Sequence, residues 1–106
     1  MNFKIFDYKR KGVNHVYLIR GEGRWSLLDL VPRMLEVSKR SRDYALQYDM
    51  TGGEFAIIDK RAPDKRRATL TLEGTLAPEI NRVRIFDEGV GKQMIDKYLR
   101  SVENSQ

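Results

Sequence analysis

Apolar and polar residues alternate along the first twenty positions in the way that a β-hairpin requires. The alternation in 2–8 assigns side chains to two faces, with Phe3, Ile5 and Asp7 on one and Lys4, Phe6 and Tyr8 on the other. The segment 15–20, HVYLIR, is rich in β-branched and aromatic residues, and Gly12 supplies a turn before it. We therefore expect two strands joined as a hairpin.

The next apolar positions follow the spacing of a helix. They recur every three or four residues and share one face: Leu27, Leu30, Val31, Met34, Leu35 and Ser38. Ser26 and Asp29 have the spacing of a capping box. Pro32 suits only a first helical turn, where its missing N–H costs nothing. The pattern predicts a helix over about 27–40 and leaves its start open between Leu27 and Val31.

Four further segments, 43–49, 54–59, 67–74 and 82–87, have the two-residue period of strands. The first is ambiguous, because 42–49 would also extend the preceding helix. The turn Thr51-Gly52-Gly53 favours a hairpin instead.

The C-terminal segment again has helical spacing. Its apolar stripe consists of Val90, Met94, Ile95, Tyr98, Leu99 and Val102, and Asp87 has the residue type of an N-cap. The order of elements is then ββ-α-ββββ-α. This order predicts an α+β fold in one domain, residues 1–106, with a mainly antiparallel sheet of about six strands and two helices on one face.

Composition narrows the possible chemistry. The chain has 106 residues, of which 41% are hydrophobic and 33% charged, and it has no cysteine. Disulfides, thiolate nucleophiles and most structural zinc sites all need the thiol, so they are excluded. No signal peptide or membrane-spanning run is visible. A cytoplasmic or nucleoid- or nucleus-associated protein without membrane contact is expected.

The positive charge is concentrated. The net charge is +5, yet the segments 9–11, 39–42 and 60–67 carry +3, +3 and +4, the last with Asp64 among five basic residues. Short connections make consecutive elements antiparallel, so all three segments should share one end of the fold. We call this predicted surface the basic pole: Lys9, Arg10, Lys11, Arg40, Arg42, Lys60, Arg61, Lys65, Arg66 and Arg67.

The basic pole predicts a non-enzymatic module that binds the phosphate backbone of DNA or RNA, with Tyr8 or Tyr17 stacking on bases. The same charges are also ordinary at hairpin tips, where they keep a protein in solution. The alternative is a protein-interaction module, an adaptor or inhibitor, that docks an acidic face of a partner or pairs through a sheet edge. Edge pairing would also allow a homodimer.

Other motifs do not predict catalysis. GEGRWS (21–26) lacks the third glycine of a dinucleotide-binding turn, and GVGK (89–92) lacks the spacing of a phosphate loop. The glycines of GVGK favour a loosened first helical turn over N–H groups left open to an anion. His15 is the only histidine and is expected at the surface, and Trp25 is expected to anchor the helix to the sheet. No catalytic residue, metal site or cofactor is predicted.

Overall fold

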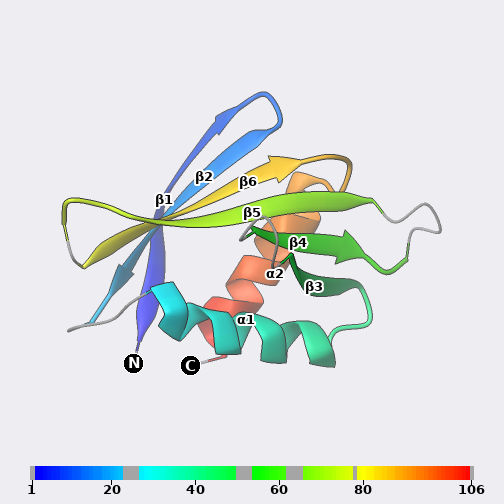
Figure 1. Ribbon diagram of the computed structural model, residues 1–106, viewed down its shortest axis with the longest axis horizontal. Coiled ribbons are helices and arrows are strands. Elements are labelled where there is room, and N and C mark those ends of the chain that lie inside the picture. The colour runs from blue at the N-terminus through cyan, green and yellow to red at the C-terminus, as the bar shows by residue number, and fades with distance from the viewer. Residues whose placement is uncertain (1, 23–26, 50–53, 62–65, 78, 106) are drawn as a thin grey trace.

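Six antiparallel strands form one sheet, and two helices cover one of its faces (Figure 1). The computed structural model describes residues 2–22, 27–49, 54–61, 66–77 and 79–105. The elements in chain order are β1 (Phe3–Lys11), β2 (Asn14–Gly21), α1 (Leu27–Arg40), β3 (Tyr44–Asp49), β4 (Glu54–Asp59), β5 (Arg67–Gly74), β6 (Ile80–Asp87) and α2 (Lys92–Asn104). The predicted α+β fold and its order are confirmed, and residues 44–49 form a strand rather than a longer helix.

The last strand in the sequence lies in the interior of the sheet. The spatial order is β1-β2-β6-β5-β4-β3, so β6 pairs with β2 on one side and with β5 on the other. The first hairpin is thereby joined to the β3–β4–β5 meander only through β6. The edge strands are β1 and β3.

A β-bulge in β1 changes which side chains face the helices. Ile5 is opposite Ile19, whereas Asp7 is opposite Leu18, so Phe6 is an extra residue in this strand. The predicted face of Phe3, Ile5 and Asp7 is therefore wrong from the bulge onward. Phe3 is buried and Ile5 half-buried, Asp7 is exposed, and Tyr8 lies opposite Tyr17 on the helix-covered side.

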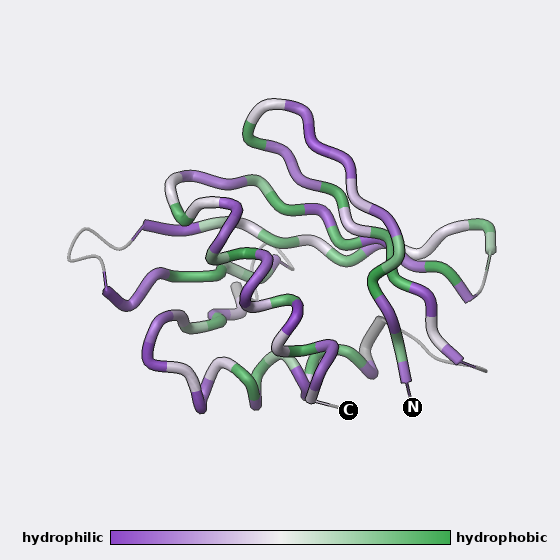
Figure 2. Tube along the Cα trace, turned by 180° about the vertical axis from the view of Figure 1, so that it is seen from behind, coloured by the Kyte–Doolittle hydropathy of each residue, from purple (hydrophilic) through white to green (hydrophobic). Residues whose placement is uncertain are grey.

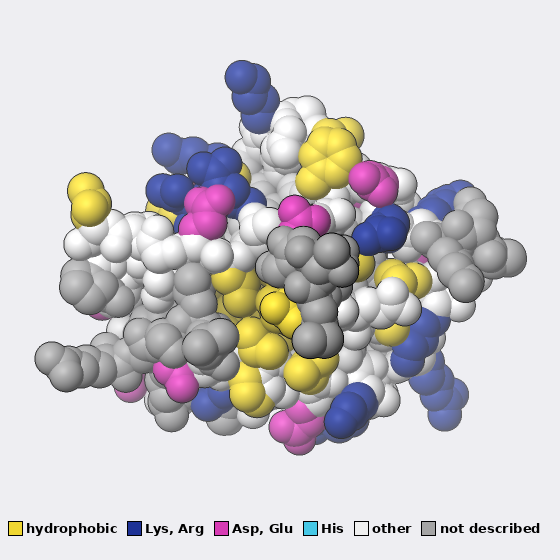
Figure 3. Space-filling view, in the orientation of Figure 1, with side chains coloured by type: hydrophobic (Ala, Val, Ile, Leu, Met, Phe, Trp, Pro, Cys, Tyr) yellow, Lys and Arg dark blue, Asp and Glu magenta, His cyan; other side chains and the backbone are white. Residues whose placement is uncertain are grey.

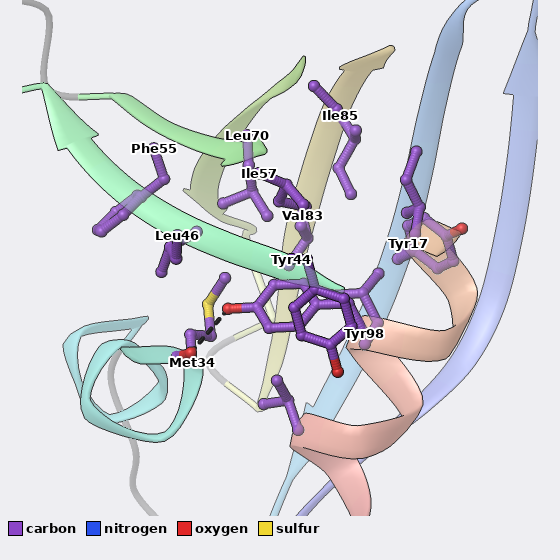
Figure 4. Packing of buried hydrophobic residues seen from close by; sticks show 14 of the residues in the cluster. Tyr17, Met34, Tyr44, Leu46, Phe55, Ile57, Leu70, Val83, Ile85 and Tyr98 are labelled. Carbon is purple, nitrogen blue, oxygen red and sulfur yellow. Dashed lines mark hydrogen bonds between the residues drawn. The ribbon is translucent and has the colours of Figure 1, made fainter. Parts of the chain in front are cut away.

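The core fills the space between the sheet and the two helices. Alternate residues of the strands point into it, together with residues of both helices (Figure 4): Tyr17, Tyr44, Leu46, Phe55, Ile57, Leu70, Val83 and Ile85 from the sheet, Met34 from α1 and Tyr98 from α2. The alternation of hydrophilic and hydrophobic residues along the strands is visible in Figure 2. The predicted apolar stripe of α2 is buried as expected.

Helix α1 includes Pro32 in its interior. The predicted helix over about 27–40 is confirmed, and of its two possible starts the structure has Leu27, which places Pro32 beyond the first turn. Burial of Leu30, Met34 and Val37 against the sheet stabilises the helix on both sides of the proline. Ser26, Trp25 and the turn 51–53 lie outside the described residues. No described helix is long and apolar enough to cross a membrane.

The two helices are joined by one buried hydrogen bond. Tyr98 of α2 is fully buried, and its hydroxyl donates to the backbone carbonyl of Met34 in α1 over 2.8 Å. Burial raises the pKa of the Tyr98 hydroxyl, so this group remains protonated and a donor.

We expect Tyr98→Phe to lower the free energy of unfolding by about 1 kcal/mol, because it removes this donor and keeps the ring. Tyr48→Phe is the matched control, because Tyr48 is 53% exposed; its effect should stay within about 0.5 kcal/mol. Urea unfolding measures both. Equal stability of the two variants would show that the hydroxyl does not join the helices.

Candidate nucleic-acid interface

The strand directions place the three basic segments at one end of the sheet. The β1–β2 turn, the link from α1 into β3 and the β4–β5 turn all lie there, because neighbouring strands alternate in direction. The link and the β4–β5 turn are adjacent, since the backbone N–H of Lys60 donates to the carbonyl of Asp43. The β1–β2 turn lies toward the opposite edge, about 20 Å away at ~4.8 Å per strand. The basic pole is therefore a rim along the sheet rather than one compact patch.

Several members of the pole make local contacts. The Arg10 Nε donates to the carbonyl of Gly12 (2.9 Å), the Lys60 Nζ donates to the carbonyl of Ser41 (2.9 Å), and the Arg61 Nε pairs with Asp59 (3.2 Å). Lys65 lies outside the described residues, and Arg66 is exposed. Of the salt bridges between described residues, none involves the exposed side chains of Lys9, Lys11, Arg40, Arg42 and Arg67.

The two tyrosines predicted to stack on bases are engaged inside the protein. Tyr17 is 3% exposed, and its hydroxyl donates to Asp96, so its ring is closed to a base. Tyr8 is half-buried, and its ring centre lies 4.8 Å from that of Tyr17 and 4.6 Å from the Lys92 Nζ. The β1 bulge turns Tyr8 toward the helix side, where the β2 register already places Tyr17. Both rings therefore pack inside the protein, Tyr17 fully and Tyr8 in part.

The sheet has a second concentration of positive charge on the face that the helices leave uncovered. We call this the open face. The register places seven basic residues on it, of which six are exposed and Arg82 is half-buried: Lys4, Lys9, Lys11, Arg20, Arg67, Arg82 and Arg84. Among the side chains that the structure describes, the acidic ones on this face are Asp7, Glu54 and Glu73.

Figure 3 shows basic side chains gathered at the upper left of the molecule, with acidic side chains beside them, and a further group at the right-hand end.

Lys4, Arg20, Arg82 and Arg84 are not in the predicted pole, because that prediction counted charges that are contiguous in the sequence. In the sequence these residues appear only as polar positions of alternating strands. That they form one charged surface can be recognised only when the strand order and the uncovered face are known.

Glu73 holds two of the open-face arginines. Its carboxylate accepts from the Arg84 Nε over 2.8 Å and from an Arg82 Nη over 3.2 Å. These hydrogen bonds, the one from Arg84 above all, lower the pKa of the Glu73 carboxyl. The groups are largely solvent-exposed, so the pairing contributes less than about 1 kcal/mol to stability. Arg82 and Arg84 remain within reach of a stronger anion.

Phe86 on the open face, Phe6 at its β1 edge and a hollow beside Phe86 add apolar surface to the charged one. Phe6 and Phe86 are 45% and 44% exposed. The Arg20 guanidinium carbon lies 5.1 Å from the centre of the Phe6 ring. Beside Phe86 is a hollow of about 180 Å³, lined by Asn14, Val16, Thr69, Thr71, Arg84 and Phe86 among others.

On the helix side of the sheet, His15 is buried, and the expectation of a surface histidine is wrong. It is 1% exposed, because the β2 register turns it inward beside Tyr17 and Ile19. The Tyr8 hydroxyl lies 2.6 Å from its Nδ1, and its Nε2 has no partner among the described groups. Burial lowers the pKa of His15, and the charge of Arg10 adds to this effect. His15 is therefore neutral near pH 7.

The backbone N–H groups of the glycine-containing loop before α2 are bound by a carboxylate of the same chain. The Asp87 carboxylate accepts hydrogen bonds from the backbone N–H groups of Gly89, Val90 and Gly91 at 2.7–2.9 Å. The prediction that Asp87 is the N-cap of α2 is wrong. Gly91, at φ 94°, holds that position. The alternative of amides open to an external anion is therefore excluded for Gly89, Val90 and Gly91.

The described residues contain no group of three or more His, Asp or Glu side chains that could hold a metal ion. Comparison of the chain with protein-family models, curated proteins and solved structures found no match.

His15 should make stability depend on pH. Its folded pKa is lowered, so below about pH 6.5 the unfolded chain takes up a proton that the folded protein resists. We expect the free energy of unfolding to fall between pH 7.5 and 5.5, by up to about 1.4 kcal/mol per pH unit below the unfolded pKa.

His15→Gln should abolish this slope, and urea unfolding at several pH values measures it. The carboxylates with lowered pKa values, Asp43, Asp59, Glu73 and Asp96, lose their contribution only near and below pH ~4.3, outside this window. An unchanged slope in the variant would assign the pH dependence to another group.

Proposed function

We propose that the protein is a non-enzymatic module that binds nucleic acid through the open face of its sheet. The observation that carries the proposal is the set of seven basic side chains on the one face that neither helix covers. These side chains come from β1, β2, β5 and β6, so the charge is spread over a surface rather than confined to a loop tip. A polyanion with regularly spaced charges fits such a surface.

The basic pole extends this surface. Lys9, Lys11 and Arg67 belong to both the pole and the open face, so the face continues into the rim at its end. The pole residues at the α1–β3 link and the β4–β5 turn supply further phosphate contacts at the far edge. Binding would be driven by counterion release, and its affinity would fall steeply with salt.

A second candidate is supported by the edge strand β3. It pairs only with β4, so the backbone groups on its other side have no strand partner within the described sheet. A second copy of the chain or a partner protein would extend the sheet there. A concentration-dependent dimer in sedimentation, without affinity for nucleic acid, would favour this function over the first.

Arg84→Gln should weaken binding to DNA or RNA and reduce the slope of log K against log salt by about 0.7–0.9, the contribution of one phosphate contact. Fluorescence anisotropy with labelled oligonucleotides, from low to physiological salt, measures both quantities. Arg100→Gln is the matched control. Arg100 is similarly exposed (58% against 51% of the side chain) and also pairs with a glutamate, but it lies on α2. Equal slopes in the two variants would remove Arg84 from the interface.

Glu73→Gln should strengthen binding at low salt by about three- to tenfold, because it removes a negative charge from the interface and releases Arg82 and Arg84 for phosphate. Glu36→Gln makes the same change of charge on an exposed position of α1 and should leave the affinity unchanged. The same anisotropy titration tests both variants. An equal gain in both would indicate an effect of net charge rather than a site on the open face.

A further inference from the structure

We infer that the ligand of the open face is a single-stranded nucleic acid whose bases stack on Phe6 and Phe86. This inference rests on the proposed function and specifies the form of nucleic acid that is bound. It starts from two large apolar side chains, each nearly half exposed, on a face that is otherwise rich in charge.

Phe86 lies within the charged surface rather than at its margin. In the sheet it is opposite Asn14 on β2 and Thr69 on β5, two small polar residues that leave its ring uncovered. Arg84 is two residues earlier on the same strand and therefore points to the same side, about 7 Å away. A nucleotide stacked on the Phe86 ring would have this guanidinium within reach of its phosphate.

Phe6 lies at the β1 edge of the open face, also beside an arginine. The β1 bulge adds this residue to the edge strand, opposite the β2 segment that leads to Arg20. The Arg20 guanidinium lies over the Phe6 ring, 5.1 Å from its centre, and the ring is still 45% exposed. An aromatic ring with an arginine beside it is suited to hold a base by stacking and its phosphate by charge.

The hollow beside Phe86 offers groups that would contact the edge of a base. It measures about 180 Å³, and its lining residues include the polar Asn14, Thr69 and Thr71 as well as the acidic Glu54. Amide and hydroxyl groups both donate and accept hydrogen bonds. The edge of an unpaired base stacked on Phe86 would meet these groups.

A duplex fits the surface poorly. The major groove of B-DNA admits a helix or a two-stranded ribbon, and a six-stranded sheet is about 24 Å across. The bases of a duplex are also stacked on one another, so they cannot stack on Phe6 or Phe86. In a single strand the flat faces of the bases are available.

The test compares four labelled probes of equal length by fluorescence anisotropy: single-stranded DNA, single-stranded RNA, duplex DNA and an abasic single strand that keeps the phosphates. We expect the protein to bind one or both normal single strands at least about tenfold more tightly than the duplex and the abasic strand. Phe6→Leu and Phe86→Leu should each weaken single-strand binding by about five- to a hundredfold and leave the salt slope unchanged.

Tyr48→Leu is the matched control, because Tyr48 is also an exposed aromatic residue (53%) but lies opposite Phe55, on the side of the sheet away from the open face. It should bind like the unaltered protein, and thermal melting checks that all three variants are folded. Equal binding of all four probes, unchanged in the Phe6 and Phe86 variants, would overturn the stacking inference and leave the proposed function intact. Absence of binding to every probe at low salt would overturn both.

Discussion

The position of β6 between β2 and β5 is the constraint on which the rest of the structure depends. Each half of the sheet alone leaves a strand edge without a partner, and the pairing of β6 with both halves closes the two edges at once. This pairing brings Arg82, Arg84 and Phe86 to the middle of the open face. On the other side of the sheet it brings Val83 and Ile85 to the centre of the core. The same strand thus supplies both the stability of the fold and the candidate interface.

The two faces of the sheet satisfy different physical requirements. The helix-covered face is largely apolar, and several of its polar groups are hydrogen-bonded to one another or to α2: Tyr17 to Asp96, Tyr8 to His15, and Asp96 to Lys92. Burial alone would raise the pKa of Asp96, but its hydrogen bonds from Lys92 and Tyr17 outweigh this effect, so the pKa is lowered and the carboxylate stays ionised. Neither described helix covers the open face, so charged side chains remain hydrated there. Glu73 acts on that face as a weak internal competitor for the two arginines.

Much of the fold could be predicted from local patterns, because each strand alternates and each helix has a single apolar stripe. The order in which the strands pair could not be predicted from these local patterns, because β6 pairs with β2 and the two strands are separated by residues 22–79. The bulge at Phe6 was missed although the letters show it, because the apolar positions change there from Phe3 and Ile5 to Phe6 and Tyr8, and the prediction kept one uninterrupted alternation. This single extra residue explains why Tyr8 was assigned to the wrong face. His15 was misjudged because a polar residue at a strand start is usually exposed, whereas the β2 register turns this one inward. Contiguous basic segments were easy to identify, but Arg20, Arg82 and Arg84 are dispersed and become neighbours only in the sheet.

The late position of β6 in the chain also has a consequence for folding during synthesis. The first hairpin emerges from the ribosome early, but its β2 edge and the β5 edge stay unpaired until residues 80–87 have been made. Contacts between segments so distant in sequence form slowly, because the chain must close a long loop before they stabilise it. For that interval the nascent chain exposes two strand edges to other chains. Arg20 lies on β2 itself and Lys9 and Lys11 on the neighbouring β1, and positive charge of this kind on a hairpin opposes the pairing of its edge with a second copy.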